Sequence, residues 1–271
     1  MALWSAVRPH QWVKNLLVAL PAVALHRYDP IPILAAFVSF CLASSSVYLV
    51  NDVIDLKRDR KHPSKKRRAV ASGRLPFQFA WIIAILLFWA SIGVAAMLDG
   101  WFIVPLGIYF LLSWSYSLYL KRIMMLDVIV LAMLYGIRVV AGAEASMIAL
   151  SHWLIAFCFF LFLCLALVKR TADSSGRPYT DDDGQLLISL ATASGFTAVV
   201  TLVLYINDLP LLYDHPNALW GICLVLVYWL GRVFLVTIRG EMHDDPVVFA
   251  LTDKASWVCA VLAAAIFWAA I

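Results

Sequence analysis

Residues 31–59 read IPILAAFVSFCLASSSVYLVNDVIDLKRD. The first part of this stretch, residues 31–50, carries no charge and has the length that an α-helix needs to cross a bilayer. The sequence then becomes polar, with Asp52, Asp55 and Asp59 at spacings of three and four residues. Because side chains three or four residues apart share a helical face, a continuing helix places the three carboxylates on one face. The stretch therefore predicts a membrane-spanning helix that ends in an acidic stripe.

The whole chain has the composition of an integral membrane protein. Hydrophobic residues make up 63% of its 271 residues and charged residues 14%, against about 45–50% and about 25% in soluble domains. This composition excludes a soluble enzyme, a disordered regulator, a secreted disulfide scaffold and a fibrous protein. The five cysteines lie in apolar stretches without a C-x-x-C pair, which predicts buried thiols rather than a disulfide or metal framework.

Apolar stretches separated by polar breaks predict a single all-α, polytopic membrane domain over residues 1–271. The first stretch is the weakest, because Lys14, Asn15 and Pro21 interrupt it. Nine membrane-spanning helices are expected, at residues 12–27, 31–50, 77–98, 101–120, 124–143, 150–170, 186–206, 217–238 and 252–271.

The distribution of Lys and Arg predicts the orientation. If the amino end lies in the cytoplasm, 19 of the 21 basic residues fall in cytoplasmic segments or helix ends, with Arg138 inside a span and Arg27 outside. The carboxyl end then faces outward. Twelve of the 17 acidic residues share the cytoplasmic side, which favours a site for a charged, metal-bound ligand there. A carrier or channel would instead scatter polar groups near the midplane of several spans.

The acidic stripe is the strongest candidate for a metal site. Three carboxylates on one face repel each other unless cations neutralise them, and Mg²⁺ typically takes one or two carboxylates together with substrate phosphates. Asp52, Asp55 and Asp59 are therefore the predicted metal ligands and catalytic residues. The alternative is a solvated helix end that is balanced by the neighbouring Lys and Arg side chains.

Basic residues in other segments are candidates for binding phosphate. The run at residues 60–68 is either an anchor at anionic lipid or a phosphate-binding loop beside the metal. Arg138 lies about 16 Å deeper than Asp127 on the same helical face, and a buried arginine needs a partner or a wet cavity. A structural ion pair and a phosphate site are both open for it. Lys169 and Arg170 suit the carboxyl end of a helix through the helix dipole alone.

The N-D-x-x-D-x-x-x-D pattern of residues 51–59, at the end of the second span, resembles the UbiA superfamily of membrane prenyltransferases. Within that superfamily the chain is most similar to the decaprenyl-phosphate phosphoribosyltransferases. The resemblance rests on the stretches 8–15, 48–53, 59–63, 137–142 and 169–173. It implies nine helices around a cavity that faces the cytoplasm. With the spacing arguments it gives the substrate-binding candidates Lys14, Asn51, Arg68, Arg74, Tyr116, Lys121, Arg138, Lys169 and Arg170.

One departure from the ordinary prenyltransferases favours a phosphate acceptor. Those enzymes have a second motif, D-x-x-x-D, where this chain has Lys169-Arg170-x-x-Asp173. Phosphates about 6 Å apart repel each other by several kcal/mol at an effective dielectric constant of about 20, and added cations offset this repulsion. The residues Asp181–Asp183 are expected to cap a helix, and His243 is assigned no role.

The resemblance implies a Mg²⁺-dependent phosphoribosyltransferase in the cell membrane, which acts in the biosynthesis of cell-wall or glycan precursors. It would transfer 5-phosphoribose from phosphoribosyl pyrophosphate to a polyprenyl phosphate, with no nucleic-acid partner and with homo-oligomerisation left open. One alternative is an aromatic or quinone-pathway prenyltransferase that uses a polyprenyl pyrophosphate. A second alternative is a transport or lipid-binding membrane protein without catalysis.

Overall fold

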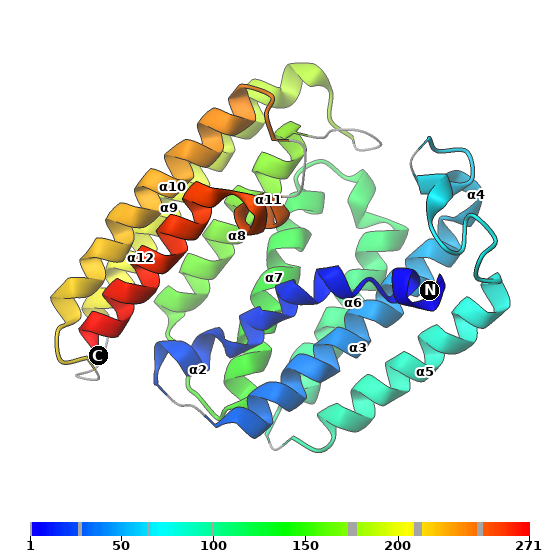
Figure 1. The fold of residues 1–271 in the computed structure, drawn as a ribbon, viewed down its shortest axis with the longest axis horizontal. Helices are drawn as coiled ribbons and strands as arrows, with labels where there is room; N and C mark the ends of the chain where they lie inside the picture. Colours follow the sequence, from blue (N-terminus) through cyan, green and yellow to red (C-terminus); the bar gives the residue numbers. More distant parts are fainter. Residues whose placement is uncertain are drawn as a thin grey trace. The chain divides into compact units, whose positions relative to one another are not determined.

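The computed structural model describes residues 2–26, 29–63, 65–98, 100–172, 178–208, 213–242 and 246–271. At residues 181 and 247 it describes the backbone but not the side chain. The regular elements in these residues are all helical (Figure 1). They form two compact units, one of residues 1–118 with 137–150 and one of residues 119–136 with 151–271. The division falls inside the helix α7 (Leu126–Ala145).

The first unit is built around two long helices that lie side by side, α3 and α5 (Figure 1). Besides the end of α7, its elements are α1 (Ala2–Val7), the 3-10 helix η1 (Pro9–Ala19), α2 (Leu20–Ala24), α3 (Pro30–Ile54), α4 (Leu56–Asp59), the 3-10 helix η2 (Lys65–Arg67), α5 (Phe77–Ala95) and α6 (Ile103–Leu118).

Small residues and hydroxyl groups hold α3 against α5. The buried Ala80 and Ala84 are four residues apart on α5, so they present one small face on which a neighbouring helix can pack closely. Ser46 Oγ of α3 donates a hydrogen bond of 2.8 Å to the carbonyl of Ala84, and Ser39 Oγ donates one of 3.0 Å to the carbonyl of Ser91. Helices in lipid gain little from apolar contact alone, so such packing and hydrogen bonding determine the pairing.

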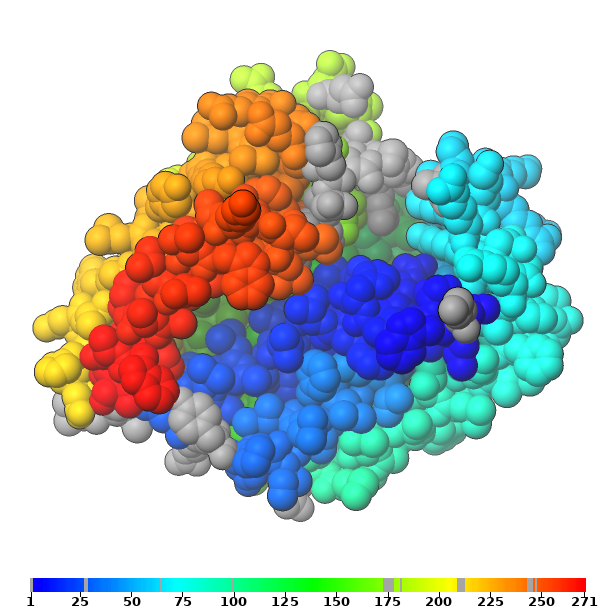
Figure 2. Space-filling model, in the orientation of Figure 1, coloured from blue at the N-terminus to red at the C-terminus, as the bar shows by residue number. Residues whose placement is uncertain are grey.

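The amino-terminal segment differs from its predicted form. Residues 12–27 were expected to be one spanning helix, but η1 and the short α2 occupy this part of the chain. Pro21 stands in the first turn of α2, where its missing amide hydrogen is tolerated, but in one α-helix over residues 12–27 its ring would clash with the carbonyl four residues earlier. Figure 2 shows the segment (blue) at the surface of the face drawn, beside α3 (lighter blue).

One glycine lets α7 approach this segment closely. A Cβ atom on Gly142 would lie 1.8 Å from the carbonyl oxygen of Val18. Only a residue without a side chain fits at that distance, so Gly142 permits the packing of η1 on the end of α7.

The second unit packs its long helices around a shared apolar core. Its elements, besides the start of α7, are the 3-10 helix η3 (Leu120–Arg122), α8 (His152–Ala172), the 3-10 helix η4 (Asp181–Asp183), α9 (Gly184–Asp208), the 3-10 helix η5 (Pro216–Leu219), α10 (Trp220–Ile238), α11 (Pro246–Thr252) and α12 (Lys254–Ala270). Leu167 and Val168 of α8 and Leu230 and Val233 of α10 are fully buried in this core. An ion pair between Arg232 Nη1 and Asp253 Oδ2, at 2.7 Å, joins α10 to the start of α12.

In the described residues, six helices are long and apolar enough to cross a membrane: α3, α5, α7, α8, α9 and η5 with α10. The helices α6 and α12 are apolar but shorter. Each predicted span except the first thus falls on a helix, and the prediction of an all-helical polytopic membrane protein is confirmed. The number of nine spans is not confirmed.

Candidate active site

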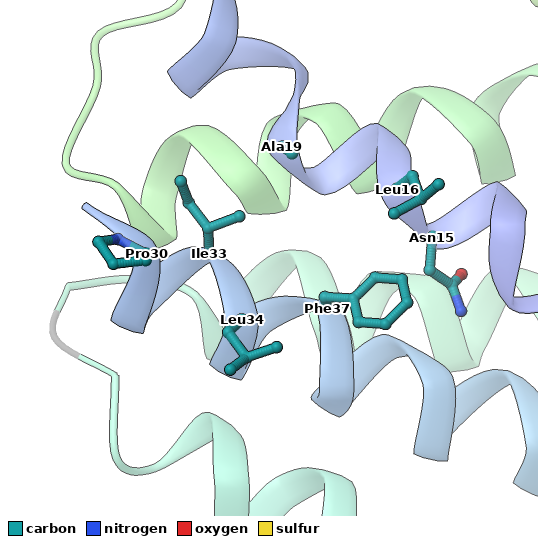
Figure 3. Close-up of a pocket in the computed structure, with 7 residues that line it drawn as sticks. All are labelled: Asn15, Leu16, Ala19, Pro30, Ile33, Leu34 and Phe37. Atoms are coloured by element: carbon teal, nitrogen blue, oxygen red, sulfur yellow. The ribbon is translucent and has the colours of Figure 1, made fainter. Parts of the chain in front are cut away.

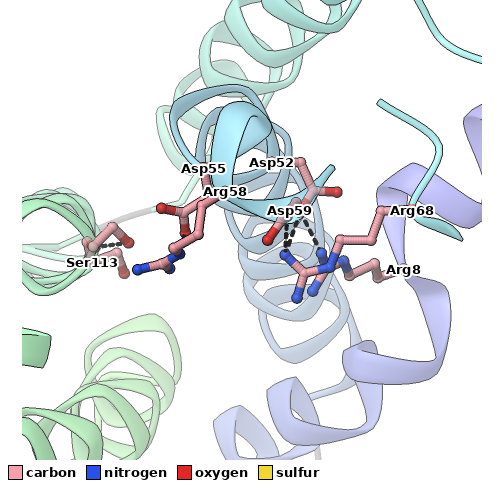
Figure 4. Close-up of polar contacts among 8 residues, drawn as sticks. Arg8, Asp52, Asp55, Arg58, Asp59, Arg68 and Ser113 are labelled. Carbon is pink, nitrogen blue, oxygen red and sulfur yellow. Dashed lines mark hydrogen bonds and ion pairs between the residues drawn. The ribbon is translucent and has the colours of Figure 1, made fainter. Parts of the chain in front are cut away.

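Two of the predicted carboxylates lie together at the end of α3. Asp52 is in the last turn of α3 and Asp59 is at the end of α4, and both are buried. Arg68 Nη1 donates to both, at 3.3 Å to Asp52 Oδ1 and 2.6 Å to Asp59 Oδ2. Arg8 Nη2 also donates to Asp52 Oδ1, at 2.5 Å (Figure 4). We call these four residues the aspartate site.

Asp55 departs from the predicted stripe. Helix α3 ends at Ile54, and Asp55 forms the turn into α4, so the helix does not continue straight through the motif. Its carboxylate pairs with Arg58 of α4 at 3.1 Å and points away from Asp52 and Asp59 (Figure 4). The prediction that all three carboxylates share one face is therefore wrong for Asp55. Its role as a metal ligand stays a prediction.

The donor atoms at the aspartate site suit Mg²⁺ that arrives with a phosphate ligand. Asp59 Oδ1 and the amide oxygen of Asn51 are buried without a hydrogen-bond partner among the described residues. In the same part of the chain, no group of three His, Cys, Asp or Glu side chains is arranged to hold a metal alone. Mg²⁺ commonly takes one or two carboxylates and completes its shell with water and phosphate. Asp52 and Asp59 fit that pattern.

Arg138 finds a polar partner inside the first unit. Its Nε donates a hydrogen bond of 2.8 Å to Asn15 Oδ1, and its guanidinium lies 4.9 Å from the centre of the Tyr109 ring. Asn15 is itself fully buried and donates from Nδ2 to Ser44 Oγ at 3.3 Å. The amide of Asn15 therefore satisfies one of the hydrogen-bond donors of the buried guanidinium. The choice between a structural and a phosphate-binding role stays open.

Arg170 lies in a buried network of the second unit. Its Nε donates to Asp127 Oδ2 at 2.7 Å, and Tyr179 donates from its hydroxyl to Asp127 Oδ1 at 2.5 Å. The Tyr179 oxygen accepts a hydrogen bond from the Met125 amide at 2.9 Å. Burial of the phenol, together with its hydrogen bond to the Asp127 carboxylate, raises the pKa of Tyr179 to about 12. Arg170 thus balances an acid of its own unit, which the sequence interpretation did not foresee.

The remaining candidates occupy more open positions. Arg74 is exposed and donates from Nη2 to the carbonyl of Arg67 at 2.6 Å, which folds the basic loop back on itself. Four further candidates are half-buried, namely Lys14, Tyr116, Lys121 and Lys169. Asp173 and His243 lie outside the described residues, as does the side chain of Asp181.

Sequence reasoning did not select Arg8 and Tyr179. Arg8 stands in the stretch 8–15 that carried part of the family resemblance, so a signal was present although no role was assigned. Tyr179 stands in a polar loop without a recognisable pattern.

An apolar groove accompanies the aspartate site in the first unit. It has a volume of about 640 Å³ and lies between η1 and the first half of α3 (Figure 3). Its lining residues are Asn15, Leu16, Ala19, Pro30, Ile33, Leu34 and Phe37. Almost all of this lining is hydrocarbon, so the groove suits an apolar chain.

Ionisable groups within membrane helices mark functional sites, and two buried carboxylates suit a hard metal ion such as Mg²⁺. The sequence model of the UbiA prenyltransferase family matches residues 15–252. The chain therefore belongs to the UbiA prenyltransferase family, and the predicted superfamily is confirmed.

Several curated proteins are similar over nearly the whole chain. The decaprenyl-phosphate phosphoribosyltransferase of Mycobacterium tuberculosis is 31% identical over 292 residues, which cover 97% of this chain and 94% of that protein. The nodulation protein NoeC of Azorhizobium caulinodans is 32% identical over 278 residues, covering 96% and 90%. An uncharacterized protein of Sinorhizobium fredii is 34% identical over 97% of this chain, which spans about half (54%) of that relative's length.

Solved structures share the fold. A UbiA homolog from Archaeoglobus fulgidus bound to DMAPP and Mg²⁺ superimposes with a TM-score of 0.78 at 15% sequence identity, covering 99% of both chains. The same homolog bound to GPP and Mg²⁺ gives a TM-score of 0.77, covering 99% of this chain and 97% of that one. At such low identity the likeness establishes the UbiA-like fold alone.

Proposed function

We propose that this protein transfers 5-phosphoribose from phosphoribosyl pyrophosphate to a polyprenyl phosphate, with release of pyrophosphate. The observation that carries the proposal is the 31% identity to a decaprenyl-phosphate phosphoribosyltransferase over nearly the full length of both chains. The proteins of similar fold whose structures contain DMAPP or GPP are only 15% identical. The specific relationship therefore favours the phosphoribosyl donor over a prenyl donor.

The residues of the aspartate site can hold a metal-bound diphosphate. Asp52 and Asp59 would bind Mg²⁺, with Asp55 as the third proposed carboxylate ligand, and Asn51 stays a proposed substrate-binding residue. When bound, the metal neutralises charge on the departing pyrophosphate. Arg68 lies within hydrogen-bonding distance of both buried carboxylates, which supports a role for its guanidinium in binding a phosphate held there by the metal.

The reaction needs positioned phosphates rather than a general base. The bond between ribose C1 and the pyrophosphate oxygen breaks, and a bond between C1 and an oxygen of the lipid phosphate forms. That oxygen is already anionic, so no proton has to be removed from it. The proposed phosphate-binding residues hold the two substrates in line, which lowers the entropic part of the barrier. Those of the first unit are Lys14, Arg68, Arg74, Tyr116 and Arg138. Lys121 and Lys169 belong to the second unit and stay predicted phosphate-binding residues.

The apolar groove offers a place for the polyprenyl chain. Asn15, at one end of the lining, contacts Ser44, which precedes Asp52 by eight residues of α3, or about 12 Å along the helix. A short prenyl group bound at Asp52 would not extend over that distance, whereas a lipid of many isoprene units would. We propose that the groove holds part of the acceptor's chain.

The proposed orientation follows the basic residues. The aspartate site and the basic loop at residues 60–68 would face the cytoplasm, where phosphoribosyl pyrophosphate is available. A reporter fused after residue 271 is expected to respond as an outward-facing terminus. An inward-facing reporter would contradict the orientation.

Prenyl transfer is the second candidate function, because proteins of the same fold bind DMAPP and GPP in their structures. Thermal unfolding of the purified protein separates the two candidates. With Mg²⁺, phosphoribosyl pyrophosphate at 100 times its Kd should add about 2.7 kcal/mol of apparent stability. Stabilisation by GPP and not by phosphoribosyl pyrophosphate would contradict the proposal.

Two variants locate the effect at the aspartate site. Asp59→Asn should lose the stabilisation, because Asp59 is a proposed metal ligand. Asp29→Asn is the matched control, since Asp29 is an exposed acid that caps the opposite end of the same α3 helix. Chelation of the metal with EDTA should reproduce the Asp59→Asn result in the parent protein.

A further inference from the structure

Arg8 is held at the aspartate site in an unusual backbone conformation. Its φ and ψ angles are 55° and 59°, the left-handed region that side chains other than glycine rarely adopt. Residues in such conformations cluster at functional sites, where the surrounding structure enforces them. The conformation directs Arg8 Nη2 to 2.5 Å from Asp52 Oδ1 and places the guanidinium 5.0 Å from the centre of the Tyr48 ring.

The backbone on both sides of Arg8 is anchored to α3. The Ser45 hydroxyl, whose one proton can be donated to the carbonyl of Val7 at 3.0 Å or to that of Cys41 at 2.7 Å, accepts a hydrogen bond of 3.0 Å from Trp12 Nε1. Ser45 precedes Asp52 by seven residues, or about two helical turns, so the two share one face of α3. The position of the Arg8 backbone relative to Asp52 is therefore fixed, and its side chain is the part that can move.

The contact between Arg8 and Asp52 competes with metal binding. Arg8 and Arg68 both donate to the same carboxylate oxygen, Asp52 Oδ1. A Mg²⁺ ion bound to this carboxylate would lie about 2.0–2.1 Å from an oxygen, and its charge would repel a guanidinium on the same group. The Arg8 side chain is 21% exposed and that of Asp52 3%, so Arg8 is the more solvent-accessible partner of this pair.

We propose that Arg8 is a donor-binding residue that exchanges partners when the donor binds. In the ligand-free protein its guanidinium neutralises Asp52. When a metal-bound diphosphate arrives, the guanidinium leaves Asp52 and binds the diphosphate, for which its planar fork is well suited. The inference rests on the proposed function only in taking the donor to be a diphosphate, which phosphoribosyl and prenyl donors share.

The exchange predicts two effects of opposite sign. Without the Arg8 guanidinium, Mg²⁺ alone meets less competition at Asp52 and should bind more tightly. Pyrophosphate in the presence of Mg²⁺ loses a charged contact and should bind more weakly. A residue that only fastened the amino-terminal segment to α3 would weaken both ligands or neither.

Isothermal titration of the full-length purified protein measures both effects, first with Mg²⁺ alone and then with pyrophosphate at saturating Mg²⁺. Arg8→Gln should gain affinity for Mg²⁺ and lose about tenfold or more for pyrophosphate, as expected for a charge-assisted contact. Arg8→Lys keeps the charge without the fork and should fall between the parent and Arg8→Gln. Arg232→Gln is the matched control, because it removes an arginine from another partly exposed Arg–Asp pair and should leave both affinities unchanged.

The outcomes separate this inference from the proposed function. Parental affinity for pyrophosphate in a folded Arg8 variant would overturn the inference, as would a parent protein that binds no pyrophosphate with Mg²⁺. If Arg8→Gln does not fold, the two affinities measured for Arg8→Lys decide the question instead. A third outcome separates the two claims. If the Arg8 variants bind pyrophosphate more weakly than the parent, but phosphoribosyl pyrophosphate does not displace pyrophosphate from the parent protein, the inference about Arg8 stands and the proposed phosphoribosyl transfer is wrong.

Discussion

Replacing Arg170 with methionine should lower the stability of the fold. If Arg170 were only a phosphate ligand, the replacement would instead weaken donor binding and leave the stability unchanged. Arg170 and Asp127 form an ion pair of 2.7 Å, and their side chains are 4% and 0% exposed. Methionine keeps much of the aliphatic length and removes the charge. The variant would leave the Asp127 carboxylate buried with the Tyr179 hydroxyl as its remaining described partner.

The expected loss follows from the burial of this pair. Removing one partner of a buried ion pair typically costs about 3–5 kcal/mol, and the remaining hydrogen bond from Tyr179 favours the lower end, near 3 kcal/mol. For a chain of this size about 1 kcal/mol corresponds to about 2–4 °C in Tm. Arg170→Met should therefore lower Tm by roughly 6–12 °C.

Thermal unfolding in detergent of four proteins tests this expectation. They are the parent, Arg170→Met, Asp127→Asn and the double variant. The double variant should recover part of the loss, because neither charge is then left buried alone. Lys169→Met is the neighbouring control and should keep a Tm close to that of the parent. A parental Tm for Arg170→Met, together with weaker donor binding, would refute the structural role and restore Arg170 as a phosphate ligand.

Three further changes have defined outcomes. In thermal unfolding, Gly142→Ala should destabilise the fold by about 1–3 kcal/mol or more, because its Cβ would lie 1.8 Å from the Val18 carbonyl oxygen. Gly136→Ala on the same helix is the control and should be tolerated, because its Cβ would meet nothing within 4 Å. Leu34→Trp narrows the apolar groove, so turnover should fall with long polyprenyl phosphates and stay unchanged with short ones; equal losses for both would contradict a chain-binding groove. Tyr179→Phe removes a buried hydrogen bond to a carboxylate and should cost about 1.5–3 kcal/mol in the same unfolding assay, and an unchanged Tm would contradict its part in the network.

The spans were predictable because hydropathy along a chain is a local property. The predicted span 31–50 and the observed α3 (Pro30–Ile54) agree closely, since lipid requires each helix to satisfy its own backbone groups. The first span failed at Pro21, where the η1 and α2 helices replace one α-helix. The length of an apolar stretch therefore does not predict whether an α-helix or a 3-10 helix forms.

The site was predictable only in part, for a different reason. Helical periodicity predicted that Asp52 and Asp59 lie together, and they do, but from two helices, α3 and α4, with Arg68 as their shared partner. It misplaced Asp55, because a turn between helices depends on the backbone rather than on spacing. The partners of Arg170 and Arg138 lie 43 and 123 residues away in the sequence, and no local pattern encodes contacts between segments so far apart.

Transfer of a labelled sugar tests the central proposal most directly. The purified protein would be incubated with Mg²⁺, phosphoribosyl pyrophosphate labelled in the ribose, and polyprenyl phosphates of several lengths, and the lipid fraction would be examined for label. We expect a labelled polyprenyl phosphoribose whose formation stops in EDTA and in Asp52→Asn. An unlabelled lipid fraction from folded protein that transfers a prenyl group from GPP to an acceptor would contradict the account.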